Sequence, residues 1–286
     1  MPASVRPIRN RIQTIENTQK ITRALEMVSA AKLKRIEGRL DFFRRYSGEL
    51  NRLLGNLLSN PELMIPPLFK KRDSIKTFVL CVMTSDTGLC GSYNHRLLQV
   101  ADDFINQYAL EAEVQLVTVG KKGFGHFKRM GLPILETYVD LHGRFSFETA
   151  QRISQDLQRI FFSSLQIQLF VAYTQFKSLL HLKPTIEKFF EPPESPSTQP
   201  IDYIMEPDLP RILEELTARY FLARGQCILL EALISEHASR MMSMRQARDN
   251  AEELLEDLTL LKNKIRQASI TTDIMEVVSA AESLKG

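Results

Sequence analysis

The sequence has few of the residues that build disulfide-rich or membrane-spanning proteins. Its three cysteines, Cys81, Cys90 and Cys227, have no paired or metal-like spacing, which argues against a disulfide framework and favours a reducing compartment. No apolar run reaches the ~18–20 residues that a membrane-spanning helix needs. The amino-terminal residues lack the apolar core of a signal peptide. If this protein works at a membrane, we expect it to do so without spanning the bilayer.

Histidine is also scarce. The five histidines form no i, i+4 pair and have no cysteine or carboxylate at ligand spacing, which argues against a metal site. No Ser-His-Asp or Cys-His assembly can be recognised. A formal charge of +3 is too small to indicate nucleic-acid binding by itself. We therefore expect no metal, no cofactor, no nucleic acid and no catalytic residue.

Proline is absent from a long segment at each end of the chain. Pro7 suits the start of a helix and Pro61 ends it, so residues 8–58 are predicted to form one helix of roughly 75 Å. Its apolar residues recur three or four positions apart, which is typical of a helix packed along one partner helix. They are Ile8, Ile12, Ile15, Ile21, Leu25, Val28, Leu33, Ile36 and Leu40.

The second such segment runs from Arg211 to Gly286, with Gly225 as its only interior glycine, and predicts a helix of roughly 110 Å. A heptad repeat in its second half predicts left-handed winding with another helix. The repeat comprises Leu254, Leu258, Leu261, Ile265, Ala268, Thr272 and Met275. The simplest arrangement pairs the two terminal helices antiparallel with each other.

Positive charge is concentrated in the first helix, because residues 1–52 hold twelve Lys and Arg against five Asp and Glu. This excess suits either a solvated face or a docking surface for an acidic partner, and both interpretations remain open.

Between the long helices, short β-branched runs alternate with helical patterns, which predicts a small α/β domain with a largely parallel sheet. A Pro/Ser-rich stretch follows it. The predicted divisions are 1–60 for the first helix, 75–190 for a Rossmann-like domain, 191–208 for a linker and 209–286 for the last helix.

Two glycine-bearing loops, "SDTGLCGSYN" at 85–94 and "GKKGFG" at 120–125, follow predicted strands, where doubly wound sheets bind phosphates. Neither has the spacing of a dinucleotide or P-loop motif. We favour structural strand-to-helix turns over a nucleotide site.

Both ends of the chain resemble one family. "RNRIQTIENTQKITRALEMVSAAKLKRI" and "SEHASRMMSMRQARDNAEELLEDLTLLKNKIRQASIT" are similar to the first and last helices of gamma subunits of F-type ATP synthases. "SDTGLCGSYN" and "YIMEPD" match family segments in order. The resemblance covers essentially the whole chain.

The resemblance implies an α/β protein: an antiparallel coiled coil of the terminal helices with an inserted Rossmann-like domain. It implies a non-catalytic rotor shaft, one copy per complex. The coil would stand inside the hexamer of alpha and beta subunits, and the base would rest on the c-ring with the epsilon subunit. It also implies a peripheral location on the cytoplasmic side of a bacterial inner membrane.

Contact residues carry over by position. The resemblance implies that Asn263, Arg266 and Gln267 engage beta-subunit loops, and that the first helix contributes contacts at the same level. Those first-helix residues are Lys20, Arg23 and Leu25. At the foot, Tyr203, Met205 and Glu206 are expected near the c-ring or epsilon.

Several positions depart from the family pattern: Lys262, Asp273, Ala280, Thr87 and Ser92. They leave open a second, divergent F-type ATPase that mainly pumps ions. Further alternatives are an α/β nucleotide-binding protein with helical extensions and an unrelated coiled-coil adaptor.

Overall fold

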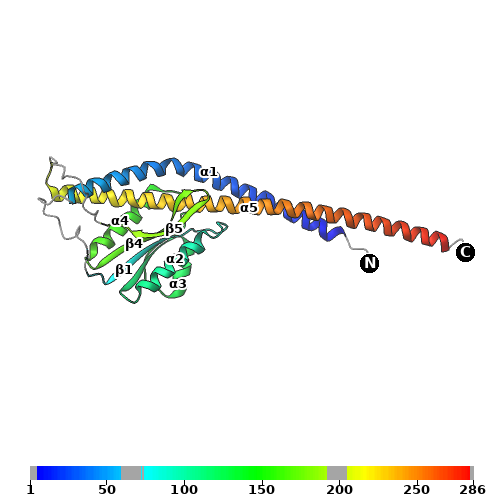
Figure 1. Ribbon diagram of the computed structural model, residues 1–286, viewed down its shortest axis with the longest axis horizontal. Helices are drawn as coiled ribbons and strands as arrows, with labels where there is room; N and C mark the ends of the chain where they lie inside the picture. The colour runs from blue at the N-terminus through cyan, green and yellow to red at the C-terminus, as the bar shows by residue number, and fades with distance from the viewer. Residues whose placement is uncertain (1–4, 59–71, 73, 192–204, 284–286) are drawn as a thin grey trace. The chain divides into compact units, whose positions relative to one another are not determined.

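The computed structural model describes residues 5–58, 72, 74–191 and 205–283. Its two long helices are α1 (Val5–Leu58) and α5 (Leu209–Ser283), which pack together and flank an inserted α/β region (Figure 1). The other elements are β1 (Thr77–Met83), α2 (Tyr93–Tyr108), β2 (Glu113–Val119), α3 (Lys121–Met130), β3 (Ile134–Tyr138), α4 (Phe147–Ser163), β4 (Ile167–Ser178) and β5 (His181–Lys188). The predicted fold class is confirmed.

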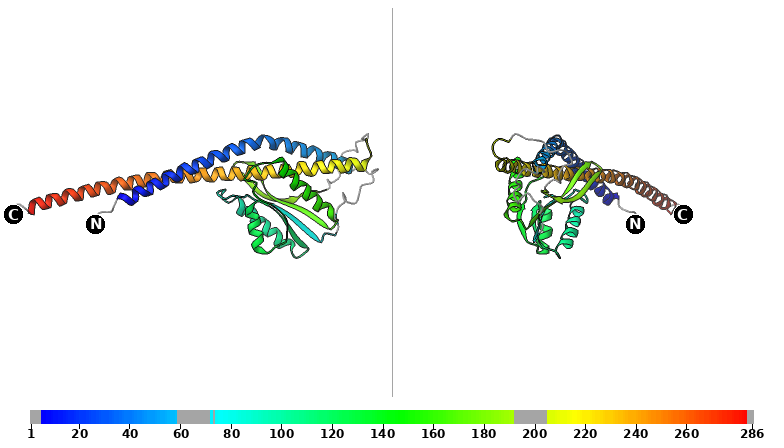
Figure 2. Two further views of the ribbon diagram at one scale, coloured as in Figure 1. Left: turned by 180° about the vertical axis from the view of Figure 1, so that it is seen from behind. Right: turned by 60° about the vertical axis from the view of Figure 1, so that its left-hand side comes forward.

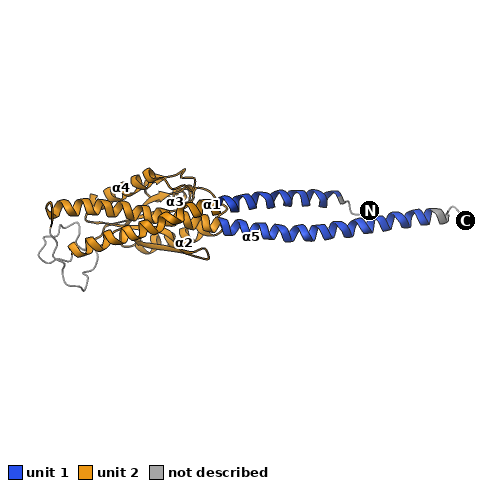
Figure 3. Ribbon diagram, turned by 90° about the horizontal axis from the view of Figure 1, so that it is seen from above, with its two compact units in different colours: residues 1–29, 241–286 blue, residues 30–240 orange. Residues whose placement is uncertain are grey.

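The chain divides into two compact units (Figure 3). Unit 1 combines Met1–Ser29 with Met241–Gly286, and unit 2 is Ala30–Arg240. The four domain limits expected from the sequence stay a prediction.

The sheet of unit 2 has the strand order β3-β2-β1-β4-β5. β1 is parallel to both β2 and β4, and β2 is parallel to β3, so the largely parallel sheet is confirmed. β5 runs antiparallel to β4 at one edge. Only Leu179 and Leu180 connect β4 to β5, and a connection this short allows a hairpin but no crossover.

The central strand β1 is covered on both faces. Val79, Cys81 and Met83 pack in one core cluster with α4, α1 and α5, whereas alternate residues pack in a second cluster with α2 and α3 (Figures 1 and 2). Successive strand residues point to opposite faces, so burial on both faces requires the continuous apolar run seen in the sequence.

Within unit 2, α5 lies between α1 and the sheet (Figures 1 and 2). It is therefore buried almost all round between Gly225 and Ala238. On α1 the predicted apolar stripe is confirmed, because Leu33, Ile36 and Leu40 are buried. The same heptad spacing continues through Leu50, Leu54 and Leu57, which are also buried.

In the part of α1 that belongs to unit 1 the stripe was predicted wrongly at two positions, whereas Ile8, Ile12, Ile15 and Leu25 are half-buried as expected. Ile21 and Val28 are 60% and 52% exposed, and the buried positions are Thr22 and Ser29. Their hydroxyls donate to the carbonyls of Gln19 and Leu25 in the same helix. Because these polar groups are satisfied within α1, small polar residues can occupy the helix–helix seam.

The predicted heptad of α5 was right at two of its seven positions. Leu258 and Ile265 are half-buried, but Leu254 and Leu261 are 50% and 44% exposed. Ala268, Thr272 and Met275 are exposed as well. The buried and half-buried positions with heptad spacing include Ala251, Leu255 and Lys262. Apolar residues that lie next to the helix–helix contact therefore show the same sequence spacing as residues that form it.

Candidate functional site

The residues predicted to contact a beta subunit are on the surface of unit 1. Lys20, Arg23, Arg266 and Gln267 are exposed, and Leu25 and Asn263 are half-buried. Within residues 6–280 whose side chains are described, no carboxylate lies within ion-pair distance of Lys20, Arg23 or Arg266. Their charges therefore stay available to an acidic partner.

One ion pair shows the antiparallel register of unit 1. Arg248 Nη1 on α5 lies 2.7 Å from Glu26 Oε2 on α1. Arg23 lies three residues from Glu26, and Arg266 lies eighteen residues from Arg248. At a rise of 1.5 Å per residue the two groups are roughly 20 Å apart along the helices. The structure therefore places these residues at two levels along the helix pair, not at the single level expected from the resemblance. That they contact a beta subunit stays a prediction.

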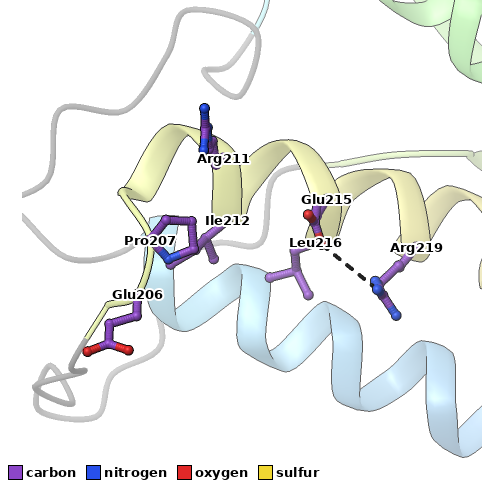
Figure 4. A pocket seen from close by; sticks show the side chains of 7 residues that line it. All are labelled: Glu206, Pro207, Arg211, Ile212, Glu215, Leu216 and Arg219. Atoms are coloured by element: carbon purple, nitrogen blue, oxygen red, sulfur yellow. Dashed lines mark ion pairs between the residues drawn. The ribbon is translucent and has the colours of Figure 1, made fainter.

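The predicted foot residues are partly described. Tyr203 lies outside the described residues. Met205 is half-buried and packs against the core cluster that contains α1 and α5, whereas Glu206 is exposed. Glu206 lines a hollow at the start of α5 (Figure 4). The other lining residues are Pro207, Arg211, Ile212, Glu215, Leu216 and Arg219.

For the loop after β1, the sequence favoured a structural turn over a nucleotide site. The Asp86 carboxylate accepts hydrogen bonds from the backbone N–H groups of Lys121, Asp140 and His142, at 2.9–3.1 Å. Lys121 is the first residue of α3, and a helix start is where α/β sheets hold phosphates. Here the chain's own carboxylate takes that position.

Side chains of α5 cover the same loop. Arg240 is 9% exposed and donates to Glu236 Oε1 at 2.7 Å. It also donates to the carbonyls of Thr87 and Gly88 and to the Thr87 hydroxyl, at 3.0–3.2 Å. Ser239 Oγ donates to the carbonyl of Cys90 at 2.7 Å. The crevice outside the carboxyl ends of the strands, which holds the ligand in doubly wound sheets, is thus filled by α5.

His237 extends this contact to the loop after β3. Its Nε2 lies 2.7 Å from the carbonyl of Gly143, and burial lowers the pKa of His237 to about 4. The ring is therefore neutral at pH 7 and donates through Nε2. Lys32 of α1 donates to the carbonyl of His142 at 3.0 Å. Together these bonds tie α5 and α1 to two loops of the sheet.

The described part of the chain shows neither a metal-binding cluster nor a membrane-spanning helix. It contains no group of three or more His, Cys, Asp or Glu side chains placed to hold a metal ion. None of its helices combines the length and the apolar character needed to cross a bilayer.

Comparison with known proteins decides the family. A family model described as ATP synthase matches residues 4–284. The ATP synthase gamma chain of Geobacter sp. strain M21 is 36% identical over 99% of this chain and 100% of its own length. The chain belongs to the ATP synthase gamma chain family. The gamma chain of Chlorobium phaeobacteroides is 33% identical over 99% of each protein.

Solved structures agree on the fold. A rotor structure of Euglena gracilis mitochondrial ATP synthase has a TM-score of 0.65 at 16% identity, covering 93% of this chain and 98% of that one. A central stalk and c-ring structure from Tetrahymena thermophila has a TM-score of 0.58 at 22% identity, covering 79% and 99%. This gamma chain is a central-stalk, non-catalytic subunit of an F-type ATP synthase.

Sequence reasoning missed the contact of this gamma chain's α5 with the sheet loops. Nothing in the sequence distinguishes the residues of this contact from ordinary surface residues of a loop and a helix. These residues are Asp86, Glu236, His237 and Arg240. The one available signal was the dense apolar run beside them, from Cys227 to Ile234, which leaves no exposed helix face.

Proposed function

We propose that this subunit turns as a shaft and couples ion flow through the membrane sector to ATP synthesis or hydrolysis at the beta subunits. In this proposal the paired helices of unit 1 contact the alpha and beta subunits, and the base contacts epsilon and the c-ring. The subunit is peripheral, on the cytoplasmic side of a bacterial inner membrane. The observation that supports the proposal best is a helix pair whose basic side chains Lys20, Arg23 and Arg266 have no carboxylate within ion-pair distance among the residues that the structure describes.

The beta-subunit contacts are proposed to lie at two levels. Arg266, Gln267 and Asn263 form the level nearer the end of α5, and Lys20, Arg23 and Leu25 form the other. Arg266 can bind a carboxylate through two parallel hydrogen bonds, and lysine cannot. At the foot, Tyr203, Met205 and Glu206 are proposed to contact the c-ring or epsilon.

One departure from the family pattern is explained locally. Thr87 replaces a residue that is often basic, and its hydroxyl accepts a hydrogen bond from Arg240. A second basic side chain here would face the Arg240 guanidinium. The change is therefore compatible with the gamma-chain fold, and work mainly as an ion-pumping ATPase stays an alternative prediction.

Coupling should depend on several weak contacts, because exposed ion pairs contribute only ~0–1 kcal/mol each. We expect Arg266→Ala to reduce ATP-driven proton pumping in inverted membrane vesicles modestly, and Arg266→Ala/Gln267→Ala to reduce it further. Lys264→Ala, at an exposed cation of the same helix, is the control and should pump like the parent. Equal pumping by the double variant and the parent would count against these contacts.

A further inference from the structure

A small cavity lies between α5 and the loops that follow β1 and β3. It has a volume of about 10 Å³, which is close to the volume of one water-sized sphere. Most of the residues that line it are apolar, but the acidic residues Asp86 and Glu236 line it as well. The cavity is therefore large enough for one small molecule and has polar groups that could hold it.

The buried carboxylate of Glu236 has one oxygen without a partner. The Glu236 side chain is 5% exposed. Its Oε1 accepts a hydrogen bond from Arg240 at 2.7 Å, whereas its Oε2 accepts none from the residues that the structure describes. A buried carboxylate oxygen without a hydrogen bond is costly, so buried polar atoms in proteins almost always have a partner from the chain or from ordered water.

The Asp86 carboxylate can also accept one more hydrogen bond. Its Oδ1 accepts from the N–H groups of Lys121 and Asp140, but its Oδ2 accepts only from that of His142. An ionised carboxylate has about four acceptor positions and no donor. Asp86 and Glu236 therefore cannot bond to each other while both are ionised. Burial raises the pKa of Glu236, and the negative charge of Asp86 raises it further.

Positive charge near the cavity already offsets the two carboxylates. Arg240 pairs with Glu236. Lys32 of α1 is close enough to Glu236, Arg144 and Arg240 for their charges to act on its pKa, which burial lowers. A further cation would add to this positive charge, whereas a neutral molecule with two donors would satisfy both carboxylates without changing the charge balance.

We propose that the cavity binds one water molecule, which donates one hydrogen bond to Glu236 Oε2 and the other to Asp86 Oδ2. Water carries two donors on one atom, and the two acceptors that line the cavity lack a donor between them. This bridging water joins α5 to the loop after β1, and through Asp86 to the start of α3 and the loop after β3. It adds a link between the long helix and the sheet that is separate from the Arg240 contacts.

A crystal structure of the full chain, at a resolution that shows ordered water, tests the site directly. We expect one peak of density at roughly 2.6–3.2 Å from both Glu236 Oε2 and Asp86 Oδ2. No density in the cavity would overturn the proposal. So would direct contact between the two carboxyl groups, which indicates a shared proton, or a peak with oxygen ligands at about 2.0–2.5 Å, which indicates a metal ion.

A matched pair of substitutions tests the site in solution. Ala232 lines the cavity and is buried. Valine and threonine have nearly the same size, and either side chain would displace the water, but only threonine carries a donor that can replace it. We expect denaturant titration to give an unfolding equilibrium constant about ten-fold larger for Ala232→Val than for Ala232→Thr, as for loss of a hydrogen bond to a charged group.

The control pair is at Ala223, which is 1% exposed on the same helix and does not line the cavity. There the order should reverse, because threonine buries a hydroxyl among apolar side chains. A dry cavity predicts the same order at both positions, with the valine variant the more stable, and that result or equal stability of the two Ala232 variants would overturn the proposal. If neither Ala232 variant folds, the density in the parent structure decides.

Discussion

Replacing Arg240 with methionine is expected to lower the free energy of unfolding of the full chain by about 3–5 kcal/mol, the usual cost of breaking a buried ion pair from one side. The substitution leaves the buried Glu236 carboxylate without its cation. It also removes the donors that reach the carbonyls of Thr87 and Gly88. Denaturant titration of the purified chain measures the loss. Arg245→Met is the control, because Arg245 is exposed on the same helix.

The cost should depend on pH in a defined direction. Burial raises the pKa of Glu236, and the charge of Arg240 opposes that rise. Without Arg240 the pKa rises further, so ionised Glu236 destabilises the fold more in the variant. A raised carboxyl pKa lowers stability as pH increases from the unfolded-state pKa to the folded-state pKa. The stability difference between variant and parent should therefore shrink as pH falls through the folded-state pKa of Glu236 in the variant, and it should be smallest near the ordinary glutamate pKa. A difference that stays constant or grows on acidification contradicts this account.

The second large effect is expected at Gly120, between β2 and α3. Its φ is +92°, and an added Cβ would lie 2.3 Å from the carbonyl oxygen of Thr84. Thr84 is fixed by its own bonds, because its N–H donates to the carbonyl of Val119 and its hydroxyl accepts from the N–H of Gly123. Backbone strain and overpacking each cost about 1–3 kcal/mol, so Gly120→Ala should destabilise the chain by about 3–5 kcal/mol.

Gly131, at the other end of α3, separates these two causes. Its φ is +71°, but an added Cβ meets no atom within 4 Å. Gly131→Ala should therefore cost only about 1–2 kcal/mol, the strain of a left-handed residue. Midpoints of chemical unfolding compare the two variants. Equal losses at Gly120 and Gly131 would show that contact with Thr84 contributes nothing.

The sequence predicted the architecture because its signals were long and regular. Proline-free segments marked both long helices, and β-branched runs such as Thr77–Met83 marked a sheet covered on both faces. Seam positions were less predictable. Ile21 and Val28 have the spacing of seam residues, but the buried seam positions are Thr22 and Ser29. A hydroxyl that donates to a carbonyl of its own helix can be buried without a hydrogen-bond partner on the other helix.

The candidate site was predictable only from the family resemblance. No periodicity distinguishes Arg266 from other exposed cations of α5, and only the Glu26–Arg248 pair shows that Arg23 lies at another level. The Arg240 contacts were out of reach for a different reason. They join α5 to loop residues about 150 positions earlier in the chain, and helix or strand periodicity describes only neighbouring residues.

Direct observation of rotation tests the central claim. The three native cysteines are buried, so a single cysteine introduced as Lys122→Cys, at an exposed position of α3, can be labelled selectively with a bead. The complex is held to a surface through its beta subunits and supplied with ATP. A shaft predicts sustained rotation of the bead in one direction, only while ATP is present. A stationary bead on complexes that hydrolyse ATP at the parental rate would contradict the account.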